Sequence, residues 1–421
     1  MILLFSLLVW LQLAKRKTLN LPPSPPKLPL IGNIHQVGKL LHHSLRDLSK
    51  KYADMVGEIV KNHDIVFSDR SRTTAANIFF YKCKDMACAP YGEYWRQVKK
   101  MSIVQLFSRQ SVQSFQFIRD EEVELLINKI RSDCLKEISR RVLSHKSEEE
   151  EDGRSKLLIL FTSLCVGDMF PYLRWVDVLT GLIPSMKTIS AELDAFLDQD
   201  FLSIIMQLQK NGTFEMDLTQ ENIKAYWTYM FVAGIDSSTT TKVWMMAELL
   251  KHPNAMKKVQ EEVRNVVGNK LKVDAEDVKT LRLHPAGPLL LPRQTSASVK
   301  FGGYDIPSNT TVLINAWAIQ RDPKWWENPE EFIPERFENS SIDFKGQDFQ
   351  LNPFGFGRRR CPGIAFGVAS IEFVMANLLY WFDWKLPAGE TAENMDMAEL
   401  YGLTVTKKTP LHVLPISHFS L

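Results

Sequence analysis

The chain lacks a marked charge imbalance and a paired cysteine pattern, and each absence excludes a class of protein. It has 51 Lys and Arg residues against 49 Asp and Glu, a formal net charge of +2. It has no basic stripe interleaved with aromatic residues, so nothing in it indicates a nucleic-acid partner. Its five cysteines are odd in number and irregularly spaced, which argues against a disulfide framework and for a reducing compartment. Cys83 and Cys88 lack zinc-site spacing, so we interpret them as structural thiols.

The N-terminus lacks an apolar run long enough to cross a bilayer comfortably. Residues 1–14 are almost wholly apolar, whereas a spanning helix needs about 20 residues. Lys15-Arg16-Lys17 follows directly, whereas a signal peptide carries its charges before the apolar run. By the positive-inside rule, this order places the rest of the chain in the cytosol. We therefore predict a membrane anchor with a basic stop over 1–17 and a stiff proline-rich hinge over 18–33. A cleaved signal peptide is the alternative.

Strand-like segments are few and internal repeats are absent, which favours a mainly α fold for residues 34–421. Apolar residues recur every three or four positions over 121–138 and 222–252, which predicts two amphipathic helices. A chain of 421 residues that is 45% hydrophobic can bury one large core or two modest ones. One large helical domain with small β-sheets is the economical architecture. The predicted strands are 299–306, 311–315 and 402–413.

One cysteine differs from the other four in its surroundings. Cys361 lies in the run PFGFGRRRCPG, behind three arginines and among glycines. Glycines permit a tight turn with inward-facing amides, and amides and arginines around a sulfur would lower its pKa and keep it as thiolate. A thiolate on a rigid loop before a long apolar helix is what a haem iron needs as an axial ligand. A buried structural cysteine is the alternative interpretation.

A second polar feature interrupts an apolar helix at residues 231–241. Here Asp236 is followed by five hydroxyl residues, which is locally unfavourable in a helix. Gly234 weakens the helix and would allow local widening, and Ser237 can hydrogen-bond the carbonyl of Ala233 and bend it. Asp236 and Ser237 with a bound water could then relay protons to a cofactor groove. The alternative is a buried helix whose hydroxyls face a neighbouring helix.

These runs resemble the cytochrome P-450 superfamily. Their sequences are most similar to those of plant microsomal members, and the resemblance extends over essentially the whole chain. The resemblance implies the multihelical P-450 fold with small β-sheets and the cofactor haem b (iron protoporphyrin IX). Cys361 would be the ligand of the iron. Pro334-Glu335-Arg336-Phe337 matches the family's PERF motif. The other positions that match the family's cysteine loop are Phe354, Gly357, Arg359 and Gly363.

The resemblance assigns further residues to the haem and to its distal side. Trp95 and Lys99 match a WxxxR helix that contacts a haem propionate; Lys99 stands at the arginine position and keeps the charge without the bidentate fork. Arg293 resembles a second propionate partner. Ser237 replaces the family's threonine beside the acid. The residues at the family's acid–alcohol motif are Ala233, Gly234, Asp236 and Ser237.

The implied activity is hydroxylation or epoxidation of a small lipophilic molecule by a monooxygenase on the endoplasmic reticulum membrane. Its partners would be NADPH–cytochrome P-450 reductase, O2, the substrate and the membrane, with the catalytic domain facing the cytosol. Phrases such as FVAGIDSSTTT look closest to terpenoid-oxidising plant enzymes. Residues 358–360 with Lys99 and Lys100 would form a basic face for an acidic reductase. A peroxide-rearranging haem enzyme and an inactive remnant or gene variant are the alternatives.

The chain also departs from the family, and we expect segments to be missing from its interior. Lys279 stands where the family's Glu-x-x-Arg motif has its glutamate, three residues before Arg282. We therefore expect Arg282 and the PERF arginine, Arg336, to lack their carboxylate partner. The first β region is expected to be truncated. The expected gaps lie between Val278 and Thr280, after Tyr52, and near residues 134–141.

Overall fold

The structure is a computed structural model of the chain. The predicted anchor over 1–17, the residue Lys279 and most of the expected gap near 134–141 lie outside the described residues. The residues that the structure describes are 19–25, 33–48, 55–135, 157, 159–163, 165–200, 218–265, 280–338, 340–345 and 347–419.

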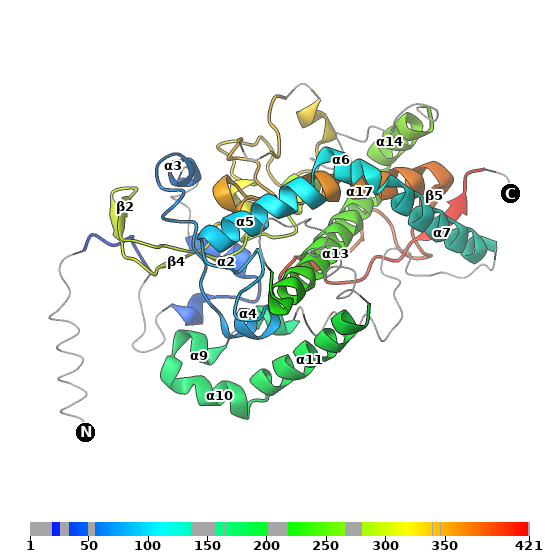
Figure 1. The fold of residues 1–421 in the computed structure, drawn as a ribbon. Helices are drawn as coiled ribbons and strands as arrows, with labels where there is room; N and C mark the ends of the chain where they lie inside the picture. Colours follow the sequence, from blue (N-terminus) through cyan, green and yellow to red (C-terminus); the bar gives the residue numbers. More distant parts are fainter. Residues whose placement is uncertain are drawn as a thin grey trace, which may run out of the picture.

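Helices make up most of the described chain, as predicted, and they surround one long central helix (Figure 1). The short N-terminal helices lie on one side of the molecule and the C-terminal strands on the other. The helices are η1 Ile34–Gln36, α2 Leu41–Leu48, α3 Met55–Asn62, α4 Thr74–Phe79, α5 Glu93–Met101, the π-helix η2 Ser102–Leu106, α6 Arg109–Ser114, α7 Gln116–Leu135, α9 Val166–Met169, η3 Pro171–Leu173, α10 Arg174–Leu179, α11 Leu182–Asp200, α13 Gln220–Lys251, α14 Pro253–Asn265, α16 Ala316–Ile319, η4 Pro334–Phe337, η5 Gly357–Arg359 and α17 Ile364–Trp381.

The central helix α13 agrees within two residues with the predicted helix 222–252. It begins after Thr219, whose side chain accepts from the backbone N–H of Asn222, while the Asn222 side chain bonds back to the backbone of Thr219. This capping box satisfies amide groups that the first helical turn leaves unpaired. The helix ends at Lys251, and Pro253 begins α14. The other predicted helix, 121–138, is α7, which starts five residues earlier, at Gln116.

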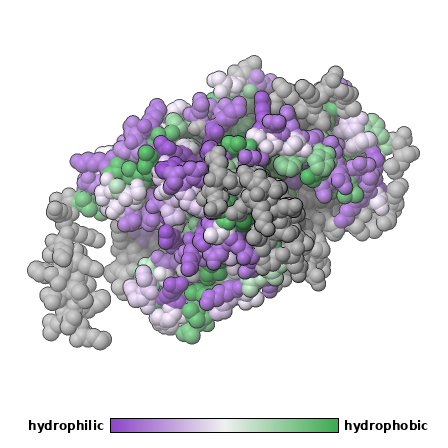
Figure 2. All heavy atoms as spheres, viewed as in Figure 1, coloured by the Kyte–Doolittle hydropathy of each residue, from purple (hydrophilic) through white to green (hydrophobic). Residues whose placement is uncertain are grey.

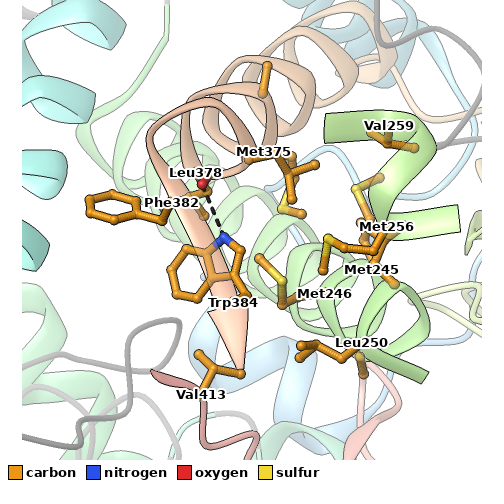
Figure 3. Close-up of a cluster of buried hydrophobic side chains, with 14 of the residues drawn as sticks. Met245, Met246, Leu250, Met256, Val259, Met375, Leu378, Phe382, Trp384 and Val413 are labelled. Carbon is orange, nitrogen blue, oxygen red and sulfur yellow. Dashed lines mark hydrogen bonds between the residues drawn. The ribbon is translucent and has the colours of Figure 1, made fainter. Parts of the chain in front are cut away.

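The main core joins α13 to α17, the helix that follows Cys361 (Figure 3). Met245 and Met246 of α13 lie fully buried beside Met375 of α17. Trp384 closes the cluster and donates its indole N–H to the carbonyl of Leu378 at 3.1 Å. Methionine is unbranched and fills irregular gaps between helices well. The packing therefore fixes the cysteine-bearing segment relative to the central helix.

The strands form four antiparallel pairs within the described residues. The predicted strand 299–306 is a hairpin, because Gly302 and Gly303 adopt φ values of +57° and +82° and turn the chain. The predicted strand 402–413 is wrong in extent, since within it only residues 406–407 form a strand and Val413 forms a single bridge. The pairs are β1 Arg293–Gln294 with β4 Thr311–Val312, β2 Val299–Phe301 with β3 Tyr304–Ile306, β5 Phe382–Lys385 with β8 Leu414–Ser417, and β6 Glu399–Leu400 with β7 Thr406–Lys407.

The region where the first β hairpin was expected carries almost no sheet. Residues 55–62 form α3, and the only pairing described between there and α4 is an isolated bridge from Asp69 to Gln294. This agrees with the predicted truncation of the first β region. The surface in this view is mostly hydrophilic, with apolar patches scattered among polar residues (Figure 2).

Among the described residues, α17 is the one helix long and apolar enough to cross a membrane. Its residues Met375, Leu378 and Leu379 are buried in the main core. It also packs against α7, α13 and α14. Packing inside the domain therefore accounts for the apolar residues on one part of this helix.

Candidate active site

The loop around Cys361 is closed by its own backbone. The Cys361 amide donates to the carbonyl of Phe354 at 3.0 Å, and the Gly355 amide donates to Asn352 at 2.9 Å. Gly355 and Gly357 have φ values of +70° and +62°, a region that costs other residues roughly 1–2 kcal/mol. The glycines therefore serve as predicted: they fold the loop tightly just before α17.

Gly357 is required for a second reason, which is the close approach of Asp64. A Cβ at Gly357 would lie 2.4 Å from Oδ1 of Asp64. Asp64 accepts from the Arg358 amide at 3.1 Å and lies 3.8 Å from the guanidinium of Arg293. The carboxylate thus fastens the cysteine loop to the segment after α3. Sequence analysis missed Asp64, because a lone acid outside any motif gives no signal.

The predicted lowering of the Cys361 pKa is wrong for the protein's own groups. Burial raises the pKa of the thiol, and the Gly363 amide, Lys99 and Arg360 only partly oppose that effect. The Arg359 guanidinium bonds elsewhere, to carbonyls of a distant segment. A metal ion deprotonates a thiol that coordinates it. Among the protein's own groups, burial of this sulfur therefore outweighs the cations beside it.

Arg359 is held between the loop and the start of α5. It donates to the carbonyls of Ser68 at 2.7 Å and Ala89 at 2.6 Å. Its guanidinium carbon lies 4.2 Å from the ring centre of Trp95. Burial, followed by the nearby cation Arg70, lowers the pKa of Arg359 to about 9. The structure therefore brings together two of the residues predicted to bind the cofactor, Arg359 and Trp95.

Trp95 and Lys99 lie on α5 directly beside the cysteine loop. The indole N–H of Trp95 donates to the carbonyl of Met86 at 2.9 Å, so it is already used inside the protein. The Lys99 ammonium bonds to the carbonyls of Arg358 and Arg360 and lies 5.1 Å from the Trp95 ring centre. Burial, then Arg359 and Arg360, lowers the pKa of Lys99 to about 8. Lys99 therefore braces the loop.

Two further arginines complete a group of buried cations near the loop. Arg293, predicted as a propionate partner, is 3% exposed and donates to the carbonyl of Phe356 at 2.8 Å. Arg70, which sequence analysis missed, donates to the carbonyls of Ala87 at 3.0 Å and Pro292 at 2.7 Å. Burial lowers the pKa of both groups, to about 10 for Arg293. Such a group of desolvated cations fits an anionic cofactor edge.

Across the site, α13 presents Asp236 and Ser237 on different faces. The Ser237 hydroxyl donates to the carbonyl of Ala233 at 2.6 Å, which confirms the predicted bond within the helix. Asp236 is 5% exposed and accepts from the hydroxyl of Thr404, near the C-terminal strands. Consecutive helical residues point about 100° apart. The acid and the alcohol therefore point in different directions, and the predicted proton relay between them stays a prediction.

The helix backbone around Gly234 is regular. The expected widening is absent, because residues 220–251 form one continuous α-helix. A Cβ built on Gly234 would meet no atom within 4 Å, whereas glycines at packed positions meet neighbours. Open space therefore lies beside this turn of α13. A flat cofactor between the cysteine loop and α13 fits that observation.

The region of the expected Glu-x-x-Arg network is built mainly from cations and carbonyls. Arg282 is 1% exposed and donates to the carbonyls of Gln320, Pro329 and Glu331 at 2.7–2.9 Å. Burial, then Arg336 and Arg321, lowers the pKa of Arg282 to about 9. None of the described residues forms an ion pair with it, and Lys279 lies outside them.

Arg336 lies near the same aromatic ring as Arg282. Its guanidinium carbon is 6.0 Å from the ring centre of Trp326, and that of Arg282 is 5.4 Å from it. Arg336 donates to the carbonyl of Asn328 at 3.2 Å, while its Nε is buried and finds no acceptor within the described part of the chain. This agrees with the expectation that the two arginines lack a shared carboxylate.

Comparison with known proteins covers nearly the whole chain. The family model Cytochrome P-450 matches residues 182–414. The chain is 44% identical to phenylacetaldehyde oxime monooxygenase of Prunus mume, over 95% of this chain and 90% of that protein. It is 42% identical to desmethylyatein synthase of Sinopodophyllum hexandrum, over 95% and 94%. It is 38% identical to germacrene A acid 8-beta-hydroxylase of Inula hupehensis, over 99% and 97%.

The alignment with the Prunus mume protein is 472 residues long, which is longer than this chain of 421 residues. That relative therefore has residues at positions where this chain has none. Among solved structures, a zebra fish cytochrome P-450 with abiraterone has the same fold, with a TM-score of 0.70 at 21% identity over 90% of this chain and all of that one. The chain belongs to the cytochrome P-450 family of haem-dependent monooxygenases.

Proposed function

We propose that this chain is a monooxygenase that hydroxylates or epoxidises a small lipophilic molecule with electrons from NADPH–cytochrome P-450 reductase. The observation that carries the proposal is the closed loop that presents Cys361 just before α17, the helix that packs against α13. When bound, haem b supplies the redox-active iron that activates O2. Every other role falls to side chains of the chain itself.

The residues around the loop would hold the cofactor from its edge and from below. Cys361 would supply the axial sulfur, and Gly357 and Gly363 keep that loop compact. Arg359 and Arg293 would balance the propionate charges, since both are buried cations bonded only to carbonyls or weakly paired acids among the described contacts. Phe354 accepts the Cys361 amide through its carbonyl and so fixes the sulfur's direction.

Lys99 and Trp95 would support the loop as well as the haem. The Lys99 ammonium joins two loop carbonyls, and Trp95 stacks against Arg359. Their contacts support a bracing role, in which the ammonium keeps the loop closed and the ring screens it from water.

On the opposite side, the turn of α13 with Ala233 and Gly234 would border the space above the cofactor. Asp236 and Ser237 would deliver protons there. The Ser237 hydroxyl donates to Ala233, which leaves its oxygen able to accept from a water or an acid. Because Asp236 faces the C-terminal strands, it would hand protons on through water.

A terpenoid or a molecule of similar size and polarity is the proposed substrate class. The amino-acid sequence of the α13 segment supports this choice, as does the relative named germacrene A acid 8-beta-hydroxylase. Apolar residues of α13 and the region 87–94 would line the pocket, because lipophilic ligands bind in mostly apolar cavities.

The proposed location is the endoplasmic reticulum membrane. Residues 1–17 would anchor the chain, 18–33 would act as a hinge, and 34–421 would form the catalytic domain in the cytosol. The order of apolar run, basic stop and proline-rich connector supports this arrangement.

The reductase would dock on the basic side of the cysteine loop. Arg358, Arg360 and Lys100 are exposed there, whereas Lys99 turns inward to the loop carbonyls. Attraction between this face and an acidic flavin domain would weaken as salt screens it. The rate of reduction should therefore fall as ionic strength rises. A rate that is unchanged between low and high salt would exclude this docking face.

The central experiment is reduced-minus-CO difference spectroscopy on the purified protein. We expect a Soret band at the long wavelength that marks thiolate ligation, and its complete loss in Cys361→Ala. The matched control is Cys165→Ala, since Cys165 is also buried but lies at the start of α9. Loss of the band in the control alone, or its persistence in Cys361→Ala, would contradict the assignment.

A non-catalytic remnant is the second candidate. The observation that favours it is Arg282, a buried cation that no described carboxylate neutralises. Sequencing the transcript separates the candidates. A message that encodes the missing segments would assign the defect to the gene model rather than to the protein in the cell.

A further inference from the structure

One face of α13 is tied to the C-terminal strands by side chains four residues apart. Asp236, Thr240 and Trp244 follow each other at this spacing, so they lie one above the other on the helix. Their described partners are two neighbouring residues, Thr404 and Val405, which lie just before β7. The contact therefore joins segments more than 160 residues apart in sequence.

The contacts form a short chain of hydroxyl groups that ends on the acid. The Thr240 hydroxyl donates to the Thr404 hydroxyl at 3.3 Å, and Thr404 donates in turn to Oδ2 of Asp236. Asp236 and Thr240 are 5% and 3% exposed, whereas Thr404 is half-buried. The half-buried Thr404 hydroxyl thus lies between two buried side chains of α13.

The backbone next to Thr404 is held independently of this contact. The Trp244 indole donates to the carbonyl of Val405 at 2.8 Å, and the Val405 amide donates to the carbonyl of Ala286 at 3.0 Å. Thr404 therefore approaches Asp236 from a fixed position. A donor on a fixed backbone can orient a carboxylate, whereas a mobile side chain cannot.

We propose that Thr404 is a positioning residue that holds the Asp236 carboxylate in the orientation needed for proton delivery. The inference rests on the proposed function, because it assumes that Asp236 supplies protons to the space beside Gly234. By fixing one carboxylate oxygen, the hydroxyl fixes the direction of the other. Each proton that Asp236 gives up is replaced by one from solvent, so the acid is regenerated and no electrons are transferred in this step.

The test compares Thr404→Val with Thr404→Ser. Valine keeps the shape and removes the hydroxyl, whereas serine keeps the hydroxyl. The control is Thr228→Val on the same helix, where the buried hydroxyl has no hydrogen-bond partner among the described residues. In membranes reconstituted with reductase, hydrogen peroxide released per NADPH consumed measures protons that arrive late or at the wrong place.

We expect Thr404→Val to raise this ratio by about tenfold, while serine and the Thr228→Val control stay within about twofold of the parent protein. Asp236→Asn combined with Thr404→Val should be no worse than Asp236→Asn alone, since Thr404 acts through Asp236. Equal effects of valine and serine, or additive effects in the double variant, would overturn the proposal.

A second readout does not depend on turnover. Amide hydrogen exchange of residues 233–240 and 402–406 should be faster in Thr404→Val and unchanged in Thr404→Ser. Faster exchange without a change in the peroxide ratio would reduce Thr404 to a structural role and overturn the proposal. If the parent protein shows no thiolate CO band, the proposed function fails. Exchange that is equal in valine and parent would separately show that the Thr404 contact does not order this segment.

Discussion

The Cys361 loop and the Arg282 region lie in the same domain, yet among the described residues only the loop finds an acidic partner that bonds to it. The loop closes on itself through backbone bonds, glycine conformations and the nearby acid Asp64. Arg282 and Arg336 instead both lie near the ring of Trp326, and their described hydrogen-bond acceptors are carbonyls. A local loop keeps its geometry when distant segments are lost, whereas a network of buried charges fails when one partner is missing.

The difference also distinguishes two tasks, which are presenting the cysteine ligand and retaining the haem. The groups that fix the Cys361 loop are its own backbone, Lys99 of α5 and Asp64 of the segment after α3. Arg282 and Arg336, in contrast, are a pair of arginines whose charge the described residues leave largely uncompensated. We therefore expect a protein with the right ligand and a weak hold on its haem.

The largest expected effect comes from repairing the Arg282 region. Restoring the missing segment, with a glutamate at the position of Lys279, should raise haem occupancy from a minor fraction to nearly one per chain. A buried charge without its partner costs about 3–5 kcal/mol. Lys279→Glu alone should recover only part, because the segment remains short. Haem content per protein and the thiolate CO band measure the outcome. Full occupancy of the unmodified chain would contradict this prediction.

The next test asks whether Glu248 substitutes for the missing acid. Its carboxylate lies 2.6 Å from Nε2 of His284 and 3.4 Å from Nδ1 of His252. Burial alone would raise the pKa of Glu248, but hydrogen bonds from the two histidines lower it to about 2. Glu248→Gln should lower the free energy of unfolding at pH 7 by about 3 kcal/mol.

The sign of the pH dependence follows from the lowered pKa of Glu248. The ionised acid stabilises the folded state above its ordinary pKa, and this contribution is lost as the pH falls toward 2. Urea unfolding at several pH values should therefore show the two proteins converging in acid. Glu261→Gln, at an exposed position on α14, is the control and should change stability by less than about 0.5 kcal/mol. If the Glu248→Gln variant also loses haem, Glu248 acts as an acidic partner of the Arg282 region.

A smaller expected effect on stability distinguishes backbone strain in the cysteine loop from steric contact with Asp64. Gly355→Ala and Gly357→Ala both place a side chain at positive φ, which costs about 1–2 kcal/mol. Only Gly357→Ala also pushes against Asp64, since the new Cβ at Gly355 meets nothing closer than 3.6 Å. We expect Gly357→Ala to unfold earlier in denaturant and to release haem faster than Gly355→Ala. Equal stability in denaturant and equal rates of haem release for the two variants would show that Asp64 moves aside freely.

The smallest expected effect is the contribution of Lys99 to the pH dependence of the free energy of unfolding. Its folded-state pKa, about 8, lies below its ordinary value because of burial and then the neighbouring arginines. Between about pH 8 and 10.5 the folded state releases this proton first, so stability rises with pH in that window. Lys99→Met should remove under about 1 kcal/mol of this rise, since the side chain is partly solvated. Identical stability-against-pH slopes for Lys99→Met and the parent protein would contradict it.

The cysteine loop and the central helix could be predicted because their signals are local. The bond from Ser237 to Ala233 depends on a spacing of four residues, and the capping box at Thr219 on a spacing of three. The hairpin at Gly302-Gly303 and the extent of the C-terminal strands were missed, because short strands are decided by what they pair with.

What the sequence determined by itself is the chemistry: a cysteine in a glycine-rich loop, a basic group around it, and an acid on a long helix. Tertiary structure alone decided which groups those residues meet. Asp64 fills the space at Gly357, Arg70 joins the buried cations, and Thr404, 168 residues from Asp236, orients the acid. It also decided the Cys361 pKa, because burial of the sulfur outweighs the cations that the sequence places next to it.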